Sequence, residues 1–240
     1  MGERLIMNDN FVFEASKRPS CLVVASEKVF PVRRIFCVGA NYVAHAIEMG
    51  RNPDRDPPFF FAKPPDAIVN ADTILNTSIP YPPNTNNFHY EIEMVVTIGK
   101  QAIDIEPDAA LSVIWGYGVG IDLTRRDLQK AAKDKGRPWE LGKGFDKSAV
   151  ISSLSPVSKI DHPKEARIWL AVNEIVKQDS NINKLIWSVP EMISVLSKTV
   201  TLEPGDIIYT GTPEGVGPIQ KGDKISGGID GLSEISLSIS

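Results

Sequence analysis

The chain has 240 residues, of which 42% are apolar and 23% are charged. This is enough apolar material to bury a core, so the composition excludes an intrinsically disordered protein. Its 26 basic and 30 acidic residues give a net charge of −4, and it has no basic block of the kind that neutralises nucleic-acid phosphates. No apolar run approaches the ~18 residues of a membrane span. We therefore expect neither a nucleic-acid nor a membrane partner.

The first residues and the cysteines indicate the cellular compartment of the protein. Residues 1–10 lack the apolar stretch of a signal peptide. Cys21 and Cys37 show no pairing pattern, which is typical of a reducing compartment. Both observations predict a cytoplasmic protein. Residues 1–30 have little hydrophobic pattern, so we interpret them as a lead-in to a single domain over residues 31–240.

Most predicted elements are short strands. In chain order, strands are predicted at 34–39, 59–62, twice within 68–79, and at 90–98, 115–123, 167–172, 175–178, 207–210, 224–226 and 235–239. Helices are predicted at 41–49, 107–113, 125–135 and 189–198, the last one starting at a capping box of Ser188 and Glu191. Asn173 and Glu174 mark a hairpin turn, and the polar, proline-containing residues 51–58 form a loop that is a candidate lid. This pattern predicts an α+β fold dominated by β-structure.

Three carboxylates form the first candidate site. Glu91 and Glu93 lie two apart on the 90–98 strand, so they project from the same face, opposite Ile92 and Met94. An exposed strand surface is the alternative interpretation of this pair. Asp122, however, ends an apolar, glycine-rich run, where a buried carboxylate needs a cation. Without cysteine or histidine at ligand spacing, the set favours Mg²⁺ first, then Mn²⁺ or Ca²⁺.

Histidine is scarce, which makes each one informative. His45 precedes Glu48 by three residues and would share a helix face with it. A carboxylate beside an imidazole fixes its tautomer and raises its basicity, which suits a general base for water. A surface pair without a role is the alternative. His89 directly precedes the glutamate pair and is a candidate to contact a metal ligand, and His162 is expected in a loop.

Two lysines and a glycine-rich loop are candidates for binding an anion. Lys63 follows an apolar strand, and Lys143 lies between Gly142 and Gly144, where a ligand can approach closely. The loop at residues 210–217 follows a strand and offers hydroxyls and backbone N–H groups. Surface lysines and a plain turn are the alternatives. Neither a dinucleotide fingerprint nor a Walker motif is present, which disfavours a nucleotide-binding protein.

Six segments, in order and with similar spacing, resemble the fumarylacetoacetate hydrolase family, in particular its compact single-domain members. The segments are Val38-Gly-Ala-Asn-Tyr-Val-Ala-His45 with Glu48, Phe59-Phe-Phe-Ala-Lys63-Pro, His89-Tyr-Glu91-Ile-Glu93, Gly120-Ile-Asp122-Leu-Thr-Arg-Arg-Asp127-Leu-Gln129, Gly136-Arg-Pro-Trp139 with Gly142-Lys143, and Tyr209-Thr-Gly-Thr-Pro-Glu-Gly-Val-Gly217. The resemblance implies a mixed β-sandwich roll with short flanking helices. It also implies a homodimer.

The resemblance assigns roles to the candidate residues. The metal carboxylates would be Glu91, Glu93 and Asp122, and the pair that activates water would be His45 and Glu48. The substrate contacts are the remaining set. Gln129 and Lys143 would hold the oxo-acid end of the substrate, and Lys143 would also stabilise an enolate. Thr212 would lie near the carboxylate at that end, and Lys63 would be a further contact. Arg125 or Arg126 would bind the carboxylate at the far end of the substrate.

The activity that the resemblance implies is hydrolysis. The expected enzyme is a metal-dependent hydrolase that cleaves the C–C bond of a 3-acylpyruvate, a small 2-oxo acid. The preferred substrate is fumarylpyruvate, an intermediate of aromatic degradation, which would give fumarate and pyruvate. Oxaloacetate decarboxylation, or isomerisation or hydration of a 2-oxo acid on the same scaffold, stays open as an alternative. A metal-binding protein without turnover is a further alternative from another class.

Overall fold

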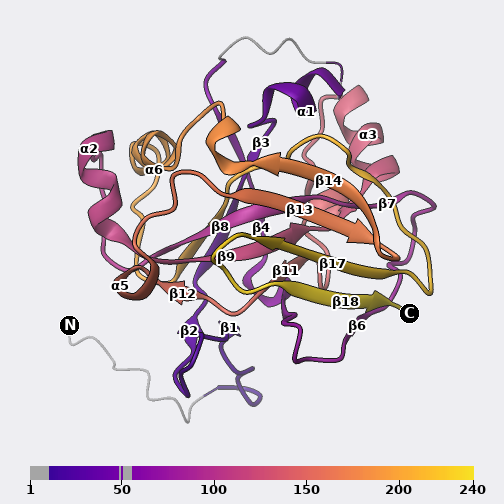
Figure 1. Cartoon of the computed structure of the whole chain (residues 1–240), viewed down its shortest axis with the longest axis horizontal. Coiled ribbons are helices and arrows are strands. Elements are labelled where there is room, and N and C mark those ends of the chain that lie inside the picture. Colours follow the sequence, from indigo (N-terminus) through magenta and orange to yellow (C-terminus); the bar gives the residue numbers. More distant parts are fainter. Residues whose placement is uncertain (1–10, 49, 51–55) are drawn as a thin grey trace.

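Two large β-sheets packed face to face dominate the computed structural model, which describes residues 11–48, 50 and 56–240 (Figure 1). One sheet has eight strands and the other has five. Short helices lie at the ends and edges of this pair of sheets, α2 and α6 at one end and α1 and α3 at another (Figure 1). The predicted fold, β-dominated and mixed with short flanking helices, is therefore confirmed.

The strands are short, as predicted, and each large sheet contains parallel and antiparallel pairs. In sheet order, the eight-stranded sheet contains β4 (Phe59–Lys63), β3 (Arg34–Gly39), β15 (Asp206–Tyr209), β8 (Ile92–Ile98), β9 (Ile114–Asp122), β11 (Ala149–Ile151) and β5 (Ile68–Asn70), with β12 (Ser155–Pro156) beside β9. The five-stranded sheet contains β14 (Ile175–Asn181), β13 (Arg167–Val172), β17 (Lys224–Ile229), β18 (Ile235–Ile239) and β6 (Thr77–Ile79). Two small sheets consist of β10 (Thr124–Arg125), β7 (Phe88–Tyr90) and β16 (Gly217–Pro218), and of β1 (Ser20–Cys21) and β2 (Phe30–Pro31).

Strand β8 runs through the centre of the molecule, and all of its residues are buried. Ile92, Met94, Val96 and Ile98 share one face, as predicted, and belong to the core between the two large sheets. Val95 points to the opposite face and packs in a second apolar cluster. Because both faces of β8 are covered, any polar side chain on it must find a partner inside the protein.

The predicted strand at 90–98 is interrupted at Glu91, which lies between β7 and β8. The chain here leaves the small sheet, where β7 pairs with β10 and β16, and enters the eight-stranded sheet. The backbone N–H of Asp122 donates to the Glu91 carbonyl (2.8 Å), which ties this break to the end of β9. The interruption therefore brings residues 91 and 122 together.

Most of the predicted helices are present. The α-helices are α1 (Val43–Glu48), α2 (Pro107–Ala110), α3 (Arg126–Asp134), α4 (Glu140–Lys143), α5 (Val157–Ile160) and α6 (Val189–Ser197), and the 3₁₀ turns are η1 (Pro65–Ala67), η2 (Leu111–Val113) and η3 (Ile182–Lys184). The capping box at Ser188 and Glu191 is formed, which confirms the predicted start of α6. The hairpin between β13 and β14 turns at Asn173 and Glu174 (φ 50° and 67°), the two residues predicted for this turn.

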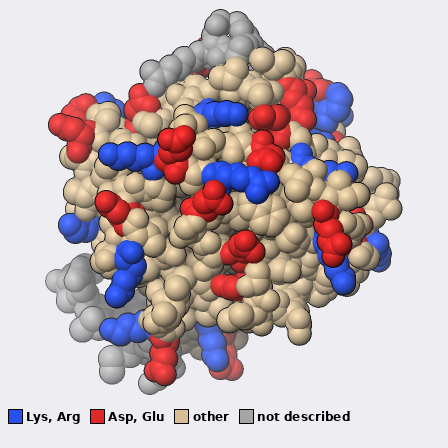
Figure 2. Space-filling view, in the orientation of Figure 1, with Lys and Arg blue, Asp and Glu red and all other residues tan. Residues whose placement is uncertain are grey.

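Several other expectations concern the surface and the termini. Cys21 and Phe30, within the predicted lead-in, are buried in the second apolar cluster, and Cys21 and Cys37 are both free. Within the part of the chain that the structure describes, no helix is long and apolar enough to cross a bilayer. Acidic and basic side chains are interspersed on the face shown in Figure 2. Residues 51–55 of the candidate lid lie outside the described residues.

Candidate active site

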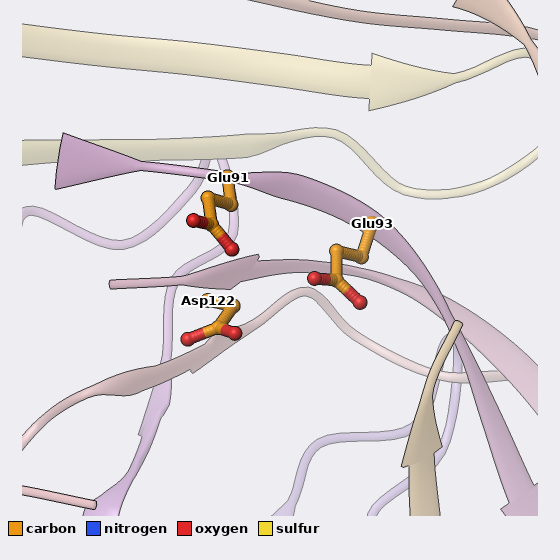
Figure 3. A group of neighbouring side chains, drawn as sticks. All are labelled: Glu91, Glu93 and Asp122. Atoms are coloured by element: carbon orange, nitrogen blue, oxygen red, sulfur yellow. The ribbon is translucent and has the colours of Figure 1, made fainter. Parts of the chain in front are cut away.

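The three predicted metal carboxylates lie together at one end of the β8–β9 strand pair. Glu91, Glu93 and Asp122 each offer an oxygen, and these oxygens all lie within 4.8 Å of one another. Figure 3 shows the three side chains pointing toward a common point. Glu93 stands opposite Gly120 in the register of the pair, and the hydrogen bond from the Asp122 N–H to the Glu91 carbonyl adds Glu91, just before β8, to the group. All three residues are buried, which contradicts an exposed strand surface.

The donor set fits a hard divalent cation. Asp122 Oδ1 lies 2.8 Å from Lys63 Nζ as an ion pair, but this buried atom accepts no hydrogen bond from any described residue. Glu93 Oε2 accepts a backbone hydrogen bond from Gly211 (2.6 Å), and the side chain forms no ion pair within the described ranges. A divalent ion would supply the missing partner for both carboxylates, because buried carboxylate oxygens are the ligands that Mg²⁺ and Mn²⁺ prefer.

Three basic side chains surround these carboxylates. Lys143 Nζ donates to Glu91 Oε2, Asp122 Oδ2 and Thr124 Oγ1, each at 2.7 Å. Arg126 pairs with Glu91 Oε1. Two buried lysines and one arginine thus face three buried carboxylates, which offsets much of the cost of burying charge.

The electrostatics differ between the two glutamates. Burial raises the pKa of Glu93, and the nearby Asp122 and Glu91 raise it further, well above its usual range. Burial also opposes ionisation of Glu91, but Lys143 and Arg126 outweigh it and hold the pKa of that carboxyl below its usual range. Lys143 likewise keeps a raised pKa, because Asp122 and Glu91 outweigh the effect of burial. Glu93 is therefore the carboxylate that depends most on an added cation.

His45 and Glu48 form the predicted pair on α1. His45 Nδ1 lies 3.1 Å from Glu48 Oε2, and Glu48 Oε1 accepts a hydrogen bond from the Gly215 backbone N–H (3.2 Å). Helix α1 is thereby connected to the 210–217 loop. Gly211 in this loop adopts φ 99°, and a side chain there would collide with Asn41 (2.6 Å). Only glycine therefore allows the loop N–H to reach Glu93 without strain.

One cavity brings most of the predicted site residues together. His45, Glu91, Glu93, Arg126, Gln129, Lys143 and Thr212 all line it, together with Lys133. Phe59, Phe61 and Trp139 form an aromatic wall of the same cavity, with ring centroids 5.4 Å apart for Phe59 and Trp139 and 5.8 Å apart for Phe61 and Trp139. The cavity thus has a charged end at the carboxylates and an apolar side.

Two predicted substrate contacts lie elsewhere. Lys63 does not line the cavity; it is fully buried behind Asp122, and its ammonium also donates to the backbone carbonyls of Leu123 and Lys143. Lys63 shares a face of β4 with Phe59 and Phe61, but it lies at the end of the strand, where Asp122 and two backbone carbonyls hold its ammonium inside the protein. Arg125 does not line the cavity either; its guanidinium stacks over Phe145, 4.3 Å from the ring centroid.

The remaining histidines have structural partners. His89 Nε2 lies 2.7 Å from Asn87 Oδ1, and its Nδ1 accepts from Arg126 (3.5 Å), which in turn contacts Glu91. Burial, with a further contribution from Arg126, lowers the pKa of His89 to about 4. His162 is in a loop, as expected, and its Nδ1 lies 2.8 Å from the Tyr117 hydroxyl.

Gln178 and Asn41 support the site and were missed by the sequence reasoning. Gln178 on β14 is fully buried; it accepts from the Ile92 N–H (3.0 Å) and donates to Thr212 Oγ1 (2.9 Å). Asn41 donates to the Thr210 carbonyl (2.8 Å) and accepts from the Trp187 N–H (2.7 Å). Both residues hold the 210–217 loop. No local pattern distinguishes them, because their partners are distant in sequence.

Hydrolysis assisted by a divalent metal needs oxygen ligands that converge on the ion and a base close to them. Glu91 and Glu93, as candidate ligands, and His45, as the candidate base, line one cavity of this fold. The fold and site thus have the features of an enzyme that uses a divalent metal, with carboxylates as the candidate ligands. The family model described as "Fumarylacetoacetate (FAA) hydrolase C-terminal" matches residues 34–239, and the chain belongs to this family. The resemblance seen in the sequence is confirmed.

Individual relatives are similar over most of their length. A fumarylpyruvate hydrolase from a Ralstonia species is 46% identical over 193 residues, which cover 80% of this chain and 98% of that protein. The crystal structure of a fumarylpyruvate hydrolase from Pseudomonas aeruginosa, in complex with Mn²⁺ and pyruvate, is 49% identical with a TM-score of 0.94 and covers 96% of this chain and 99% of that one. A mitochondrial oxaloacetate tautomerase from Arabidopsis thaliana is 40% identical over 206 residues, 86% of this chain and 90% of that protein.

Proposed function

We propose that this protein is a metal-dependent hydrolase that cleaves the C–C bond of a 3-acylpyruvate, with fumarylpyruvate as the substrate and fumarate and pyruvate as the products. The observation that carries the proposal is that two carboxylates of the triad, Glu91 and Glu93, line one cavity with His45, which a carboxylate orients, while Asp122 lies directly beside them. The relatives named fumarylpyruvate hydrolase, at 46% and 49% identity, support the choice of substrate.

Glu91, Glu93 and Asp122 would hold the cation, which we take to be Mg²⁺ with Mn²⁺ as a substitute, and the bound ion would polarise the oxo-acid end as a Lewis acid. Gln129 and Thr212, which line the cavity, would hold the same end. The Gln129 Oε1 atom accepts from Arg126, which leaves its amide N–H₂ to donate to substrate. Thr212 Oγ1 accepts from Gln178, which leaves its hydroxyl proton to donate to a carboxylate.

His45 acts as the general base in this proposal. Glu48 holds the Nδ1 side of the ring, so Nε2 is the atom that takes a proton from water. The hydroxyl attacks the distal carbonyl carbon, C4, and the C3–C4 bond breaks. Its electron pair stays on C3 and forms the enolate of pyruvate, which becomes pyruvate when C3 takes up the proton that water lost. C4 becomes the new carboxyl of fumarate. Lys143 lines the cavity as the cation that stabilises the developing enolate.

Oxaloacetate tautomerisation is the second candidate, because several relatives carry that name at 37–40% identity. This reaction also forms an enol of a 2-oxo acid, but it needs no attacking water. The activity of the wild type on the two substrates distinguishes the candidates, and His45→Ala tests the proposed base of the hydrolase, because tautomerisation also needs a group that moves a proton. For a hydrolase we expect pyruvate release from acylpyruvates to fall at least ~100-fold, the usual contribution of a general base.

The matched control is His162→Ala, since His162 contacts Tyr117 away from the cavity. Wild type and both variants are assayed for pyruvate release from fumarylpyruvate and acetylpyruvate and for enol–keto conversion of oxaloacetate. If His45→Ala keeps its hydrolytic rate, or if wild type converts oxaloacetate but releases no pyruvate from acylpyruvates, the hydrolase proposal is wrong.

We also propose that the protein is a homodimer. Its expected cytoplasmic location stays a prediction.

A further inference from the structure

We propose that Lys133 recognises the far carboxylate of the acyl group and thereby selects dicarboxylic acylpyruvates. This inference rests on the proposed hydrolase function and adds a specificity-determining residue to it. Lys133 lines the cavity that Glu91 and Glu93 of the carboxylate triad also line, and it lines the adjoining hollow next to His89 and Val216. It therefore stands where the cavity opens, away from the metal ligands.

Helix α3 places Lys133 on the same face as two residues of the charged end. Arg126, Gln129 and Lys133 follow the spacing of three and four residues that defines one side of a helix, and all three line the cavity. Seven residues of helix correspond to a rise of about 10 Å. This is the scale of a chain of seven carbons with a carboxylate at each end. One face of α3 thus spans the length of the substrate.

Among the cations near the cavity, Lys133 is the one with no committed partner. Arg126 is held by Glu91 and by Gln129 (2.7 Å). Lys143 is bound to Glu91 and Asp122, and Lys130 on the neighbouring face pairs with Asp134 (2.6 Å). Lys133 is exposed, and its side chain forms no ion pair or hydrogen bond with any described residue. Its ammonium is available to an anionic ligand.

The aromatic wall explains why a flat acyl chain would reach this lysine. Phe59 and Trp139 line the side of the cavity with their rings at 90° to each other. A fumaryl group is planar because its double bond is conjugated with both carbonyl carbons, so it suits a passage lined by aromatic rings. Its terminal carboxylate lies three carbons beyond the carbonyl that water attacks. An acetyl group ends at a methyl and has no charge to offer.

The test compares two substrates in three variants of the metal-loaded enzyme. Lys133→Met removes the charge and keeps much of the aliphatic stem, and Lys133→Arg keeps the charge. Lys135→Met is the matched control, because Lys135 is exposed at the C-terminal end of the same helix and lines neither cavity. For each enzyme, kcat and KM are measured with fumarylpyruvate and acetylpyruvate.

We expect Lys133→Met to lower the fumarylpyruvate-to-acetylpyruvate ratio of kcat/KM about tenfold, the usual effect of losing one charged hydrogen bond. The loss lies mainly in KM for fumarylpyruvate, because the far carboxylate is bound equally before and during reaction. Lys133→Arg restores most of the ratio, and Lys135→Met keeps the wild-type ratio.

An unchanged ratio in Lys133→Met overturns the inference, whether the two rates stay the same or fall together, and so does an equal effect in Lys135→Met. These outcomes leave the proposed function intact, because wild type still hydrolyses acylpyruvates. A wild-type enzyme that releases no pyruvate from either substrate overturns the proposed function, and the inference falls with it.

Discussion

Replacing Gln178 by leucine tests whether the 210–217 loop is held by the hydrogen bonds seen here. The side chain is fully buried and forms three hydrogen bonds of 3.0 Å or less: it accepts from the Ile92 N–H and donates to Thr212 Oγ1 and the Pro213 carbonyl. Leucine has a similar volume but satisfies none of these groups. At about 1 kcal/mol for each bond, the free energy of unfolding should fall by about 3 kcal/mol.

Activity should fall as well, because Thr212 is no longer held. We expect KM for fumarylpyruvate to rise more than kcat falls, since Thr212 is proposed to bind the substrate's carboxylate and not to move a proton. Urea unfolding gives the stability, and initial rates of pyruvate release give kcat and KM. Gln101→Leu is the control: Gln101 is exposed and donates to Glu203 (2.7 Å), so its loss should cost less than ~0.5 kcal/mol.

The reasoning is refuted if Gln178→Leu unfolds within ~0.5 kcal/mol of wild type. It is also refuted if stability falls as expected while KM stays at the wild-type value. The first result would mean that the buried partners find other hydrogen bonds. The second would mean that the loop keeps Thr212 in place without Gln178.

Three further outcomes are expected. Mg²⁺ at 100 times its Kd should raise the free energy of unfolding by about 2.7 kcal/mol over that of the EDTA-treated protein, as measured by thermal unfolding. Glu93→Gln should abolish most of this Mg²⁺-dependent stabilisation. Lys63→Met should lower stability in urea by about 3 kcal/mol, because it leaves the buried Asp122 Oδ1 without its ion-pair partner, since Lys143 is bound to Oδ2; a loss under 1 kcal/mol would contradict this. Burial raises the pKa of Asp127, but hydrogen bonds from Thr85 and the Asn86 N–H outweigh it and lower that pKa below its usual range. The folded protein therefore gains stability from ionised Asp127 at neutral pH and loses it as the pH falls through the folded pKa. In urea unfolding, Asp127→Asn should cost about 1 kcal/mol at pH 7 and progressively less as the pH falls through that pKa.

Local patterns predicted much of the fold because the signals act over a few residues. The capping box at Ser188 and the turn at Asn173 and Glu174 depend only on neighbouring backbone, and both are formed. Helix α4 was not predicted, because four residues, Glu-Leu-Gly-Lys, are too short for a periodic pattern. Gly142 in that helix approaches the Gln129 backbone so closely that a side chain would collide (2.8 Å), which is a tertiary constraint.

The sequence predicts the site residues whose charge is unusual for their position in the chain. Glu91, Glu93 and Asp122 stood out as charges within apolar strands, and they converge. The orientation of Lys63 could not be predicted, because it depends on Asp122 and on carbonyls 60 and 80 residues away. Only the packed sheets show that this lysine lies behind the metal ligands.

The origin of the three carboxylates has a consequence for how such enzymes diverge. Glu91, Glu93 and Asp122 all belong to the paired β8 and β9 region, whereas Lys133 and the aromatic rings stand on other elements. Substitutions at Lys133, or in the rings of β4, can therefore change the acyl group that is accepted while the proposed metal ligands keep their partners. Related enzymes can in this way change from one 2-oxo acid substrate to another while the strands that carry the carboxylates stay the same. One scaffold can therefore serve different reactions.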